Sequence, residues 1–139
     1  AMVKAAVDAL PNTSVTGVTI LTSLSEADVT EIGFRSAALQ SAVALARIAV
    51  DAGARAIVCS PLEISAVRHE VGATPIIITP GVRPLDMVGT DDQQRTMTPQ
   101  DAIAAGANLV VIGRPITQSW AQGAHAMKER AQEIGANLI

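Results

Sequence analysis

Short apolar runs alternate with amphipathic stretches along this chain of 139 residues. The apolar runs occupy residues 15–21, 56–59, 75–79 and 109–112. Each run is too short for a typical helix, is rich in β-branched residues, and is followed at once by Thr, Ser, Pro or Gly. Short continuous apolar runs bounded by turn residues predict strands buried on both faces of a parallel sheet.

The stretches between these runs have the periodicity of helices. Their apolar positions fall on single helical faces: Leu39, Val43, Ala46 and Val50; Ile64, Val67 and Val71; and Trp120, Ala124, Met127, Ala131 and Ile134. Thr98 followed by Pro99 predicts a helix start, with threonine as the cap and proline in the first turn. Glycines stand where helices are expected to end: Gly53, Gly72, Gly106 and Gly135.

The resulting order is strand, helix, repeated four times, which predicts an α/β fold with a parallel sheet. Four βα units are half of a (β/α)₈ TIM barrel. No linker or composition shift divides the chain, so residues 1–139 are expected to form one domain. The alternation alone does not distinguish this half-barrel from a doubly wound open sheet.

Composition narrows the function classes. The chain is 49% hydrophobic and 17% charged with a net charge of −3, so nothing favours general binding to nucleic acid or to a membrane, and any anion site must be local. Cys59 is the only cysteine, which excludes an internal disulfide and indicates a reducing, cytoplasmic location. We expect this thiol to be a small core residue. We expect His69, His125 and the Lys4–Asp8 pair to lie on solvated helix surfaces.

Polar residues follow the predicted strands. In βα barrels the chemistry lies at the carboxyl ends of the strands, and phosphate is often held by the loops after the last two strands. The third strand is followed by Pro80, Arg83 and a polar segment, 84–97, that contains Gln93. The fourth strand leads directly into Gly113 and Arg114. A glycine lets the backbone approach an anion closely, and an arginine can bond a phosphate with two parallel hydrogen bonds.

Several motifs together resemble one family. The segments GVTILTSL, VCSP, TPGVRP and DQQRTMTPQDAIAAGANLVVIGRPIT are similar to the second half of bacterial orotidine 5′-phosphate decarboxylases, from Ala1 to about Gln118. The resemblance implies a carboxy-lyase of pyrimidine biosynthesis that converts orotidine 5′-monophosphate to uridine 5′-monophosphate and CO₂ without a cofactor. It also implies that residues 1–139 form the C-terminal half-barrel, or core domain, of that enzyme.

The resemblance also implies roles for individual residues. Thr22 matches the residue that contacts the pyrimidine, and Pro80 matches the apolar wall near the departing carboxylate. Gly113 and Arg114 match the clamp that binds the 5′-phosphate, and Gln93 matches the glutamine of the loop that closes over it. Arg83 matches the arginine of the family's PGxRP element, which is commonly assigned to ligand binding. A one-residue slip to Gln94 remains open.

The chain departs from the family at the catalytic centre. The family uses an Asp-x-Lys-x-x-Asp motif whose lysine stabilises and protonates the carbanion. That motif is absent here, and the two lysines, Lys4 and Lys128, fall in predicted helices. Phosphate contacts without a positive charge at the carbanion would bind the ligand without accelerating its decarboxylation. We therefore expect weak phosphate or nucleotide binding, no catalytic residue and no appreciable turnover by the chain alone.

Three interpretations follow from these patterns. The chain is a catalytically incomplete family member, a phosphate-binding half-barrel that needs a separate N-terminal half, or a non-catalytic assembly module. A related barrel acting on sugar phosphates is less favoured, because the full set of motifs matches the pyrimidine enzyme. A half-barrel exposes unpaired strand edges, so we also expect self-association into a homodimer or larger oligomer.

Overall fold

Four parallel strands form a single sheet in the computed structural model, which describes residues 1–87 and 96–138. The strands are β1 (Thr16–Val18), β2 (Ala56–Val58), β3 (Ile76–Thr79) and β4 (Leu109–Val110). They lie in the order β1-β2-β3-β4, each parallel to its sequence neighbour. The predicted parallel α/β sheet is confirmed, although each strand is shorter than its apolar run.

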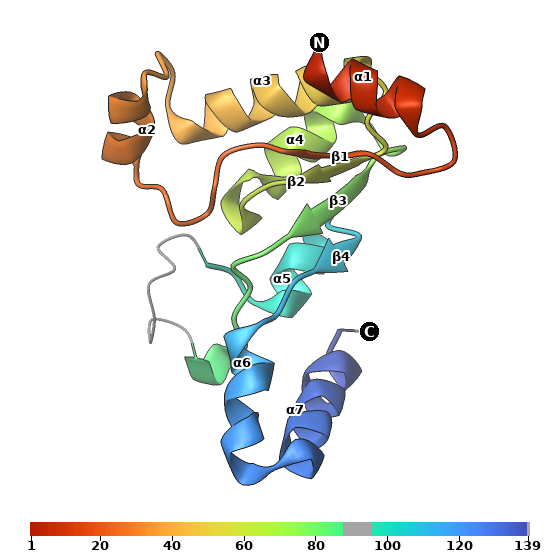
Figure 1. Ribbon diagram of the computed structural model, residues 1–139. Helices are drawn as coiled ribbons and strands as arrows, with labels where there is room; N and C mark the ends of the chain where they lie inside the picture. The colour runs from red at the N-terminus through yellow and green to blue at the C-terminus, as the bar shows by residue number, and fades with distance from the viewer. Residues whose placement is uncertain (88–95, 139) are drawn as a thin grey trace.

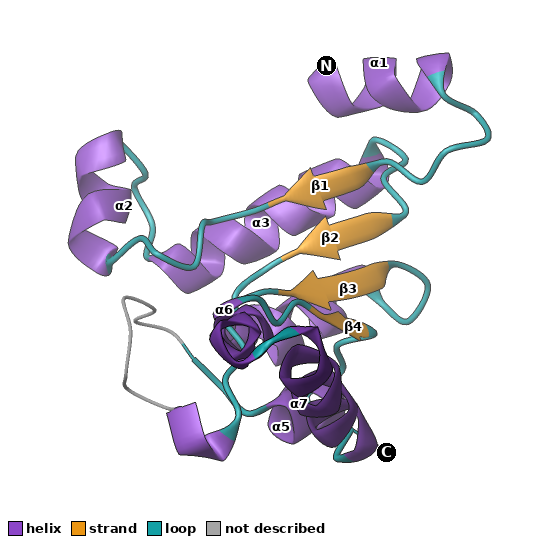
Figure 2. Ribbon diagram, turned by 60° about the horizontal axis from the view of Figure 1, so that its bottom comes forward, coloured by secondary structure: helices purple, strands orange, loops and turns teal. Residues whose placement is uncertain are grey.

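Helices connect the strands and extend beyond the β4 edge (Figure 1). They are α1 (Met2–Ala9), α2 (Glu26–Ile32), α3 (Ala38–Asp51), α4 (Ile64–Val71), α5 (Pro99–Ala104), α6 (Arg114–Thr117) and α7 (Ala124–Ala136). Short 3₁₀ helices occur at η1 (Pro61–Glu63), η2 (Leu85–Met87) and η3 (Gln118–Gln122). The strand order never reverses, and Figure 2 shows α3 behind the strands. A doubly wound sheet reverses its order and carries helices on both faces, so this sheet is consistent with a half-barrel and not with a doubly wound fold.

The main core lies between the sheet and these helices. Ile57 and Ile77 point from the strands into a buried cluster that includes Ala49 of α3 and Val67 of α4. Helix α3 lies close to β1: a Cβ added to Gly17 would lie 2.7 Å from the Cβ of Ala49. Small residues on both sides of this contact therefore set the distance between α3 and the sheet.

The opposite face of the sheet is open. Side chains alternate along a strand, and the residues flanking the buried positions are exposed: Val18 (58%), Ile76 (40%), Leu109 (53%) and Val111 (50%). The register aligns Val18 with Val58 and Ile78 with Leu109. This apolar face corresponds to the inside of a closed barrel.

Two sequence predictions about the C-terminal region are wrong. The apolar stripe from Trp120 to Ile134 is not one helix, because Gly123 has a φ of 102° and separates η3 from α7. Trp120 is consequently 60% exposed. Gly135 does not end a helix, since α7 continues to Ala136. A glycine inside a helix costs only about 1 kcal/mol, which packing can offset.

Candidate phosphate site at the strand ends

The ends of β3 and β4 lie side by side. Thr79 and Val110 are paired in the sheet, and the Val111 N–H donates to the Thr79 carbonyl at 2.9 Å. The segments that carry Arg83 and Arg114 therefore leave the sheet at the same rim. Each arginine follows its strand end by four residues, Arg83 after Thr79 and Arg114 after Val110.

Arg83 is held in a fixed position after β3. Its N–H donates to the Met97 carbonyl at 2.9 Å, and Val82 forms a parallel bridge with Met97. Its Nη1 donates to the Val82 carbonyl at 2.9 Å, and the residue is only 4% exposed. The Arg83 guanidinium is therefore a largely buried positive charge at the base of the rim.

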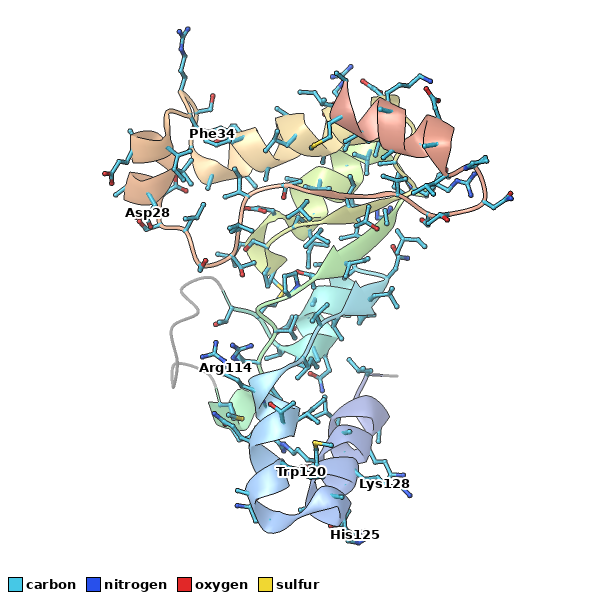
Figure 3. All side chains as sticks on the ribbon, in the orientation of Figure 1. Asp28, Phe34, Arg114, Trp120, His125 and Lys128 are labelled. Atoms are coloured by element: carbon cyan, nitrogen blue, oxygen red, sulfur yellow. The ribbon has the colours of Figure 1, made fainter. Side chains whose placement is uncertain are left out.

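Gly113 and Arg114 form the turn between β4 and α6. The Gly113 carbonyl accepts hydrogen bonds from Ile116 at 2.9 Å and Thr117 at 3.0 Å. A Cβ at Gly113 would meet no atom within 4 Å, so open space lies beside this backbone. Arg114 is exposed, and Figure 3 shows its side chain at the start of α6, on the side of the carboxyl ends of the strands.

Thr22 lies at the opposite edge of the sheet from Arg114. It is half-buried in a turn closed by the Leu24 N–H, which donates to the Leu21 carbonyl at 3.1 Å. Three spacings of roughly 4.8 Å separate β1 from β4 in a flat sheet, or about 14 Å. A ligand that contacts both Thr22 and Arg114 must therefore be extended. The half-buried Pro80 lies between them at the end of β3, whereas Gln93 and Gln94 lie outside the described residues.

A buried polar pair at the end of β2 was not predicted from the sequence. Glu63 is 1% exposed, and its Oε2 accepts the Ser60 N–H at 2.9 Å. The Oγ of Ser60 is fully buried without a hydrogen-bond partner in the described part of the chain. A signal was present, because Ser-x-x-Glu after a strand is the pattern of a capping box.

Cys59 beside this pair is a core residue, as predicted. Burial raises the pKa of its thiol to about 12, and the negative charge of Glu63 adds to the increase. A thiol that stays protonated at neutral pH is a poor nucleophile.

The remaining candidate groups lie away from the rim. Lys4 pairs with Asp8 on α1, as expected, and Lys128 projects from the surface of α7 (Figure 3). His69 is exposed on α4, and His125 pairs with Glu129 on α7. Among residues 1–87 and 96–138, no cluster of three His, Cys, Asp or Glu side chains could hold a metal ion. Within the same residues, no helix is long and apolar enough to cross a membrane.

A parallel βα sheet with consecutive strand order and polar loops at the carboxyl ends defines a protein of the βα-barrel class. The sequence matches the family described as orotidine 5′-phosphate decarboxylase / HUMPS over residues 1–129. The chain therefore belongs to this family.

Individual relatives agree with this assignment. The chain is 50% identical over 138 residues to the orotidine 5′-phosphate decarboxylase of Thermobifida fusca (strain YX), covering 98% of this chain and 59% of that protein. It is 49% identical over 117 residues to that of Frankia casuarinae, covering 84% of this chain and 42% of the relative. The crystal structure of the Lactobacillus acidophilus enzyme superposes with a TM-score of 0.73 at 30% identity, covering 96% of this chain and 58% of that one. The chain thus spans at most about three fifths of these relatives.

Proposed function

We propose that this chain is the phosphate- and pyrimidine-binding half of an orotidine 5′-phosphate decarboxylase, and that it does not decarboxylate the substrate alone. The observation that carries the proposal is the pairing of β3 with β4, which brings the segments bearing Arg83 and Arg114 to one rim. Family membership supplies the ligand class, since the named relatives act on a nucleotide with a 5′-phosphate.

Two arginines suit a phosphate dianion. A guanidinium offers paired donors that match two phosphate oxygens, and each charge-assisted bond contributes about 1.5–3 kcal/mol net. Burial of Arg83 reduces screening of its charge by water. Thr22 and Pro80 then face the pyrimidine end of the extended ligand, and Gln93 belongs to the loop over the phosphate.

Turnover in this family depends on a lysine at the carbanion, and neither lysine of the chain lies at the rim. Loss of CO₂ without an electron sink needs a fixed positive charge at the developing carbanion. Lys4 lies on the surface of α1, and Lys128 lies on the surface of α7. Binding energy from the phosphate cannot accelerate the reaction when the charged centre is missing.

Calorimetry with uridine 5′-monophosphate and with inorganic phosphate tests the binding. Arg114→Met should weaken both by about tenfold or more, from the loss of one charge-assisted contact. Arg35→Met is the matched control, because it removes the same charge from an exposed residue between α2 and α3. Equal effects of the two substitutions, or no binding by the unaltered chain, would refute the proposed site.

Complementation tests the missing half. The chain should release no CO₂ from orotidine 5′-monophosphate, and activity should appear when a separately produced N-terminal half of a relative is added. Turnover by the chain alone would disprove the argument from the lysines. Failure both to bind nucleotide and to complement would favour the assembly-module interpretation.

We also propose that a second copy of the chain covers the open sheet face. A twofold axis along the barrel would place β4 of each copy parallel to β1 of the other copy. Each exposed edge strand would then pair with an edge strand of the second copy. Val18→Asp should then yield a folded monomer by sedimentation and circular dichroism. Ile48→Asp, on the outer surface of α3 and 63% exposed, should leave the dimer intact. A monomeric unaltered chain at micromolar concentration would rule this out.

A further inference from the structure

Arg130 of α7 makes contacts that the proposed site does not explain. Its Nη2 donates to both carboxylate oxygens of Asp86, at 2.9 and 2.7 Å. Its Nη1 donates to Glu133 at 2.9 Å, and its Nε makes a longer contact of 3.4 Å with the Pro115 carbonyl. The side chain is 17% exposed, so most of it is packed against these partners.

These contacts join the two segments of the rim. Asp86 lies in η2, three residues after Arg83, and Pro115 directly follows Arg114. The Met87 N–H donates to the Pro84 carbonyl at 2.9 Å and closes the turn that presents Asp86. One guanidinium therefore fastens the segment after β3 to the segment after β4, and α7 supplies the support.

We propose that Arg130 is a positioning residue that sets the separation of Arg83 and Arg114 for a phosphate group, through Asp86 on one segment and the Pro115 carbonyl on the other. This inference rests on the proposed phosphate site. Arg130 does not touch the ligand and acts through the two segments that it joins.

The charges of the pair support a persistent contact. The hydrogen bond from Arg130 lowers the pKa of Asp86, and hydrogen bonds to Asp86 and Glu133 raise the pKa of Arg130. Both groups are ionised at neutral pH, so the contact lasts across the physiological range. A planar guanidinium can hold two segments at once, which the single ammonium group of lysine cannot do in the same geometry.

Positioning and simple electrostatics predict opposite signs for one substitution. Arg130→Met removes a positive charge and weakens phosphate binding under either explanation. Asp86→Asn removes a negative charge near the rim, so electrostatics alone would strengthen phosphate binding. Positioning instead predicts weaker binding, because asparagine offers Arg130 one neutral acceptor oxygen in place of a carboxylate that accepts at both oxygens.

The experiment is calorimetry of the full chain with inorganic phosphate and with uridine 5′-monophosphate. Arg130→Met and Asp86→Asn should each weaken the binding of both ligands by about three- to tenfold. The double variant should bind no less tightly than the single variant with the lower affinity. Lys128→Met, which removes the same charge from the exposed surface of α7, should change binding less than about twofold. Phosphate binding by Asp86→Asn that equals or exceeds that of the unaltered chain would overturn the inference.

Hydrogen exchange separates this inference from the proposed function. In Arg130→Met the amides of Met87 and Ile116, which hydrogen-bond within the two rim segments, should exchange faster, while Lys128→Met leaves them unchanged. If the unaltered chain binds no phosphate, the proposed function fails, and this measurement still decides whether Arg130 holds the segments. Unchanged exchange at both amides would show that it does not.

Discussion

Arg68 is expected to be the most important single polar side chain for stability in the described part of the chain. From α4 it reaches the loops that precede β3 and β4, at the end of the strands opposite the rim. Its Nη1 donates to the Gly72 carbonyl at 2.7 Å and to the Pro75 carbonyl at 2.8 Å. Its Nη2 donates to Asn108 Oδ1 at 2.6 Å and to the Gly106 carbonyl at 3.1 Å.

The cost of removing this side chain can be worked from these contacts. A hydrogen bond to a charged donor contributes about 1.5–3 kcal/mol, but bonds that share one side chain are not additive and exposed acceptors regain water. Arg68→Met keeps most of the aliphatic packing and removes the donors. We expect the free energy of unfolding to fall by about 2–4 kcal/mol.

Urea denaturation followed by circular dichroism measures this change. Arg55→Met is the matched control, because Arg55 is exposed and its guanidinium donates a long hydrogen bond of 3.3 Å to Pro11. It should cost less than about 1 kcal/mol. If the two substitutions cost the same, the Arg68 contacts do not stabilise the fold.

Two further predictions concern packing and pH. Gly17→Ala should destabilise the fold by about 1–3 kcal/mol in the same assay, because the new Cβ would lie 2.7 Å from the Cβ of Ala49. Gly135→Ala, whose Cβ would meet nothing within 4 Å on α7, should instead be neutral or stabilising. The Cys59 thiol has its pKa raised from 9.0 to about 12 by burial, so well below pH 9 it is protonated in both states and does not affect stability. Above pH 9 the unfolded state loses the proton first, and stability should fall by about 1.4 kcal/mol per pH unit until about pH 12. A Cys59→Ala variant with the same alkaline slope would contradict this, and no tyrosine complicates the titration.

The elements that could be predicted from the sequence are those whose buried residues form a continuous apolar run or a periodic apolar stripe. The strands beginning at Thr16 and Ala56 were visible because both faces of a barrel strand are apolar. Helix α2 was missed, although Ser25 and Asp28 form a capping box at its start. Its single buried residue, Val29, gave no periodic stripe, so only the cap marked it.

Candidate site residues were predicted less completely, for a physical reason. Motif resemblance indicated Arg83 and Arg114, but not that the first would be buried next to the bridge between Val82 and Met97 while the second stays exposed. Nor could spacing show that Arg130 contacts Asp86, because the two residues are 44 positions apart. Long-range polar contacts depend on how helices pack over the sheet, which a hydrophobic pattern does not encode.

The shortness of β4 links stability to binding. This strand contains two residues, and the backbone bonds beside it are Asn108 N–H to Ile77 and Val111 N–H to Thr79, both 2.9 Å. So few ladder bonds leave its register dependent on side chains. Asn108 Oδ1 accepts the Ile77 N–H at 2.8 Å while it also accepts Arg68, which fixes the strand at its start.

Contacts beyond the carboxyl end of β4 also help to fix its position. Arg130 holds the Pro115 carbonyl and Asp86 beyond the strand ends. Arg114 lies four residues after Val110, so a slip of β4 relative to β3 would shift Arg114 relative to Arg83. A parallel strand that slips by one residue also turns its side chains to the other face. The positions of the two rim arginines therefore depend on polar contacts at both ends of one short strand, and a substitution at Arg68 that leaves the chain folded should still weaken phosphate binding.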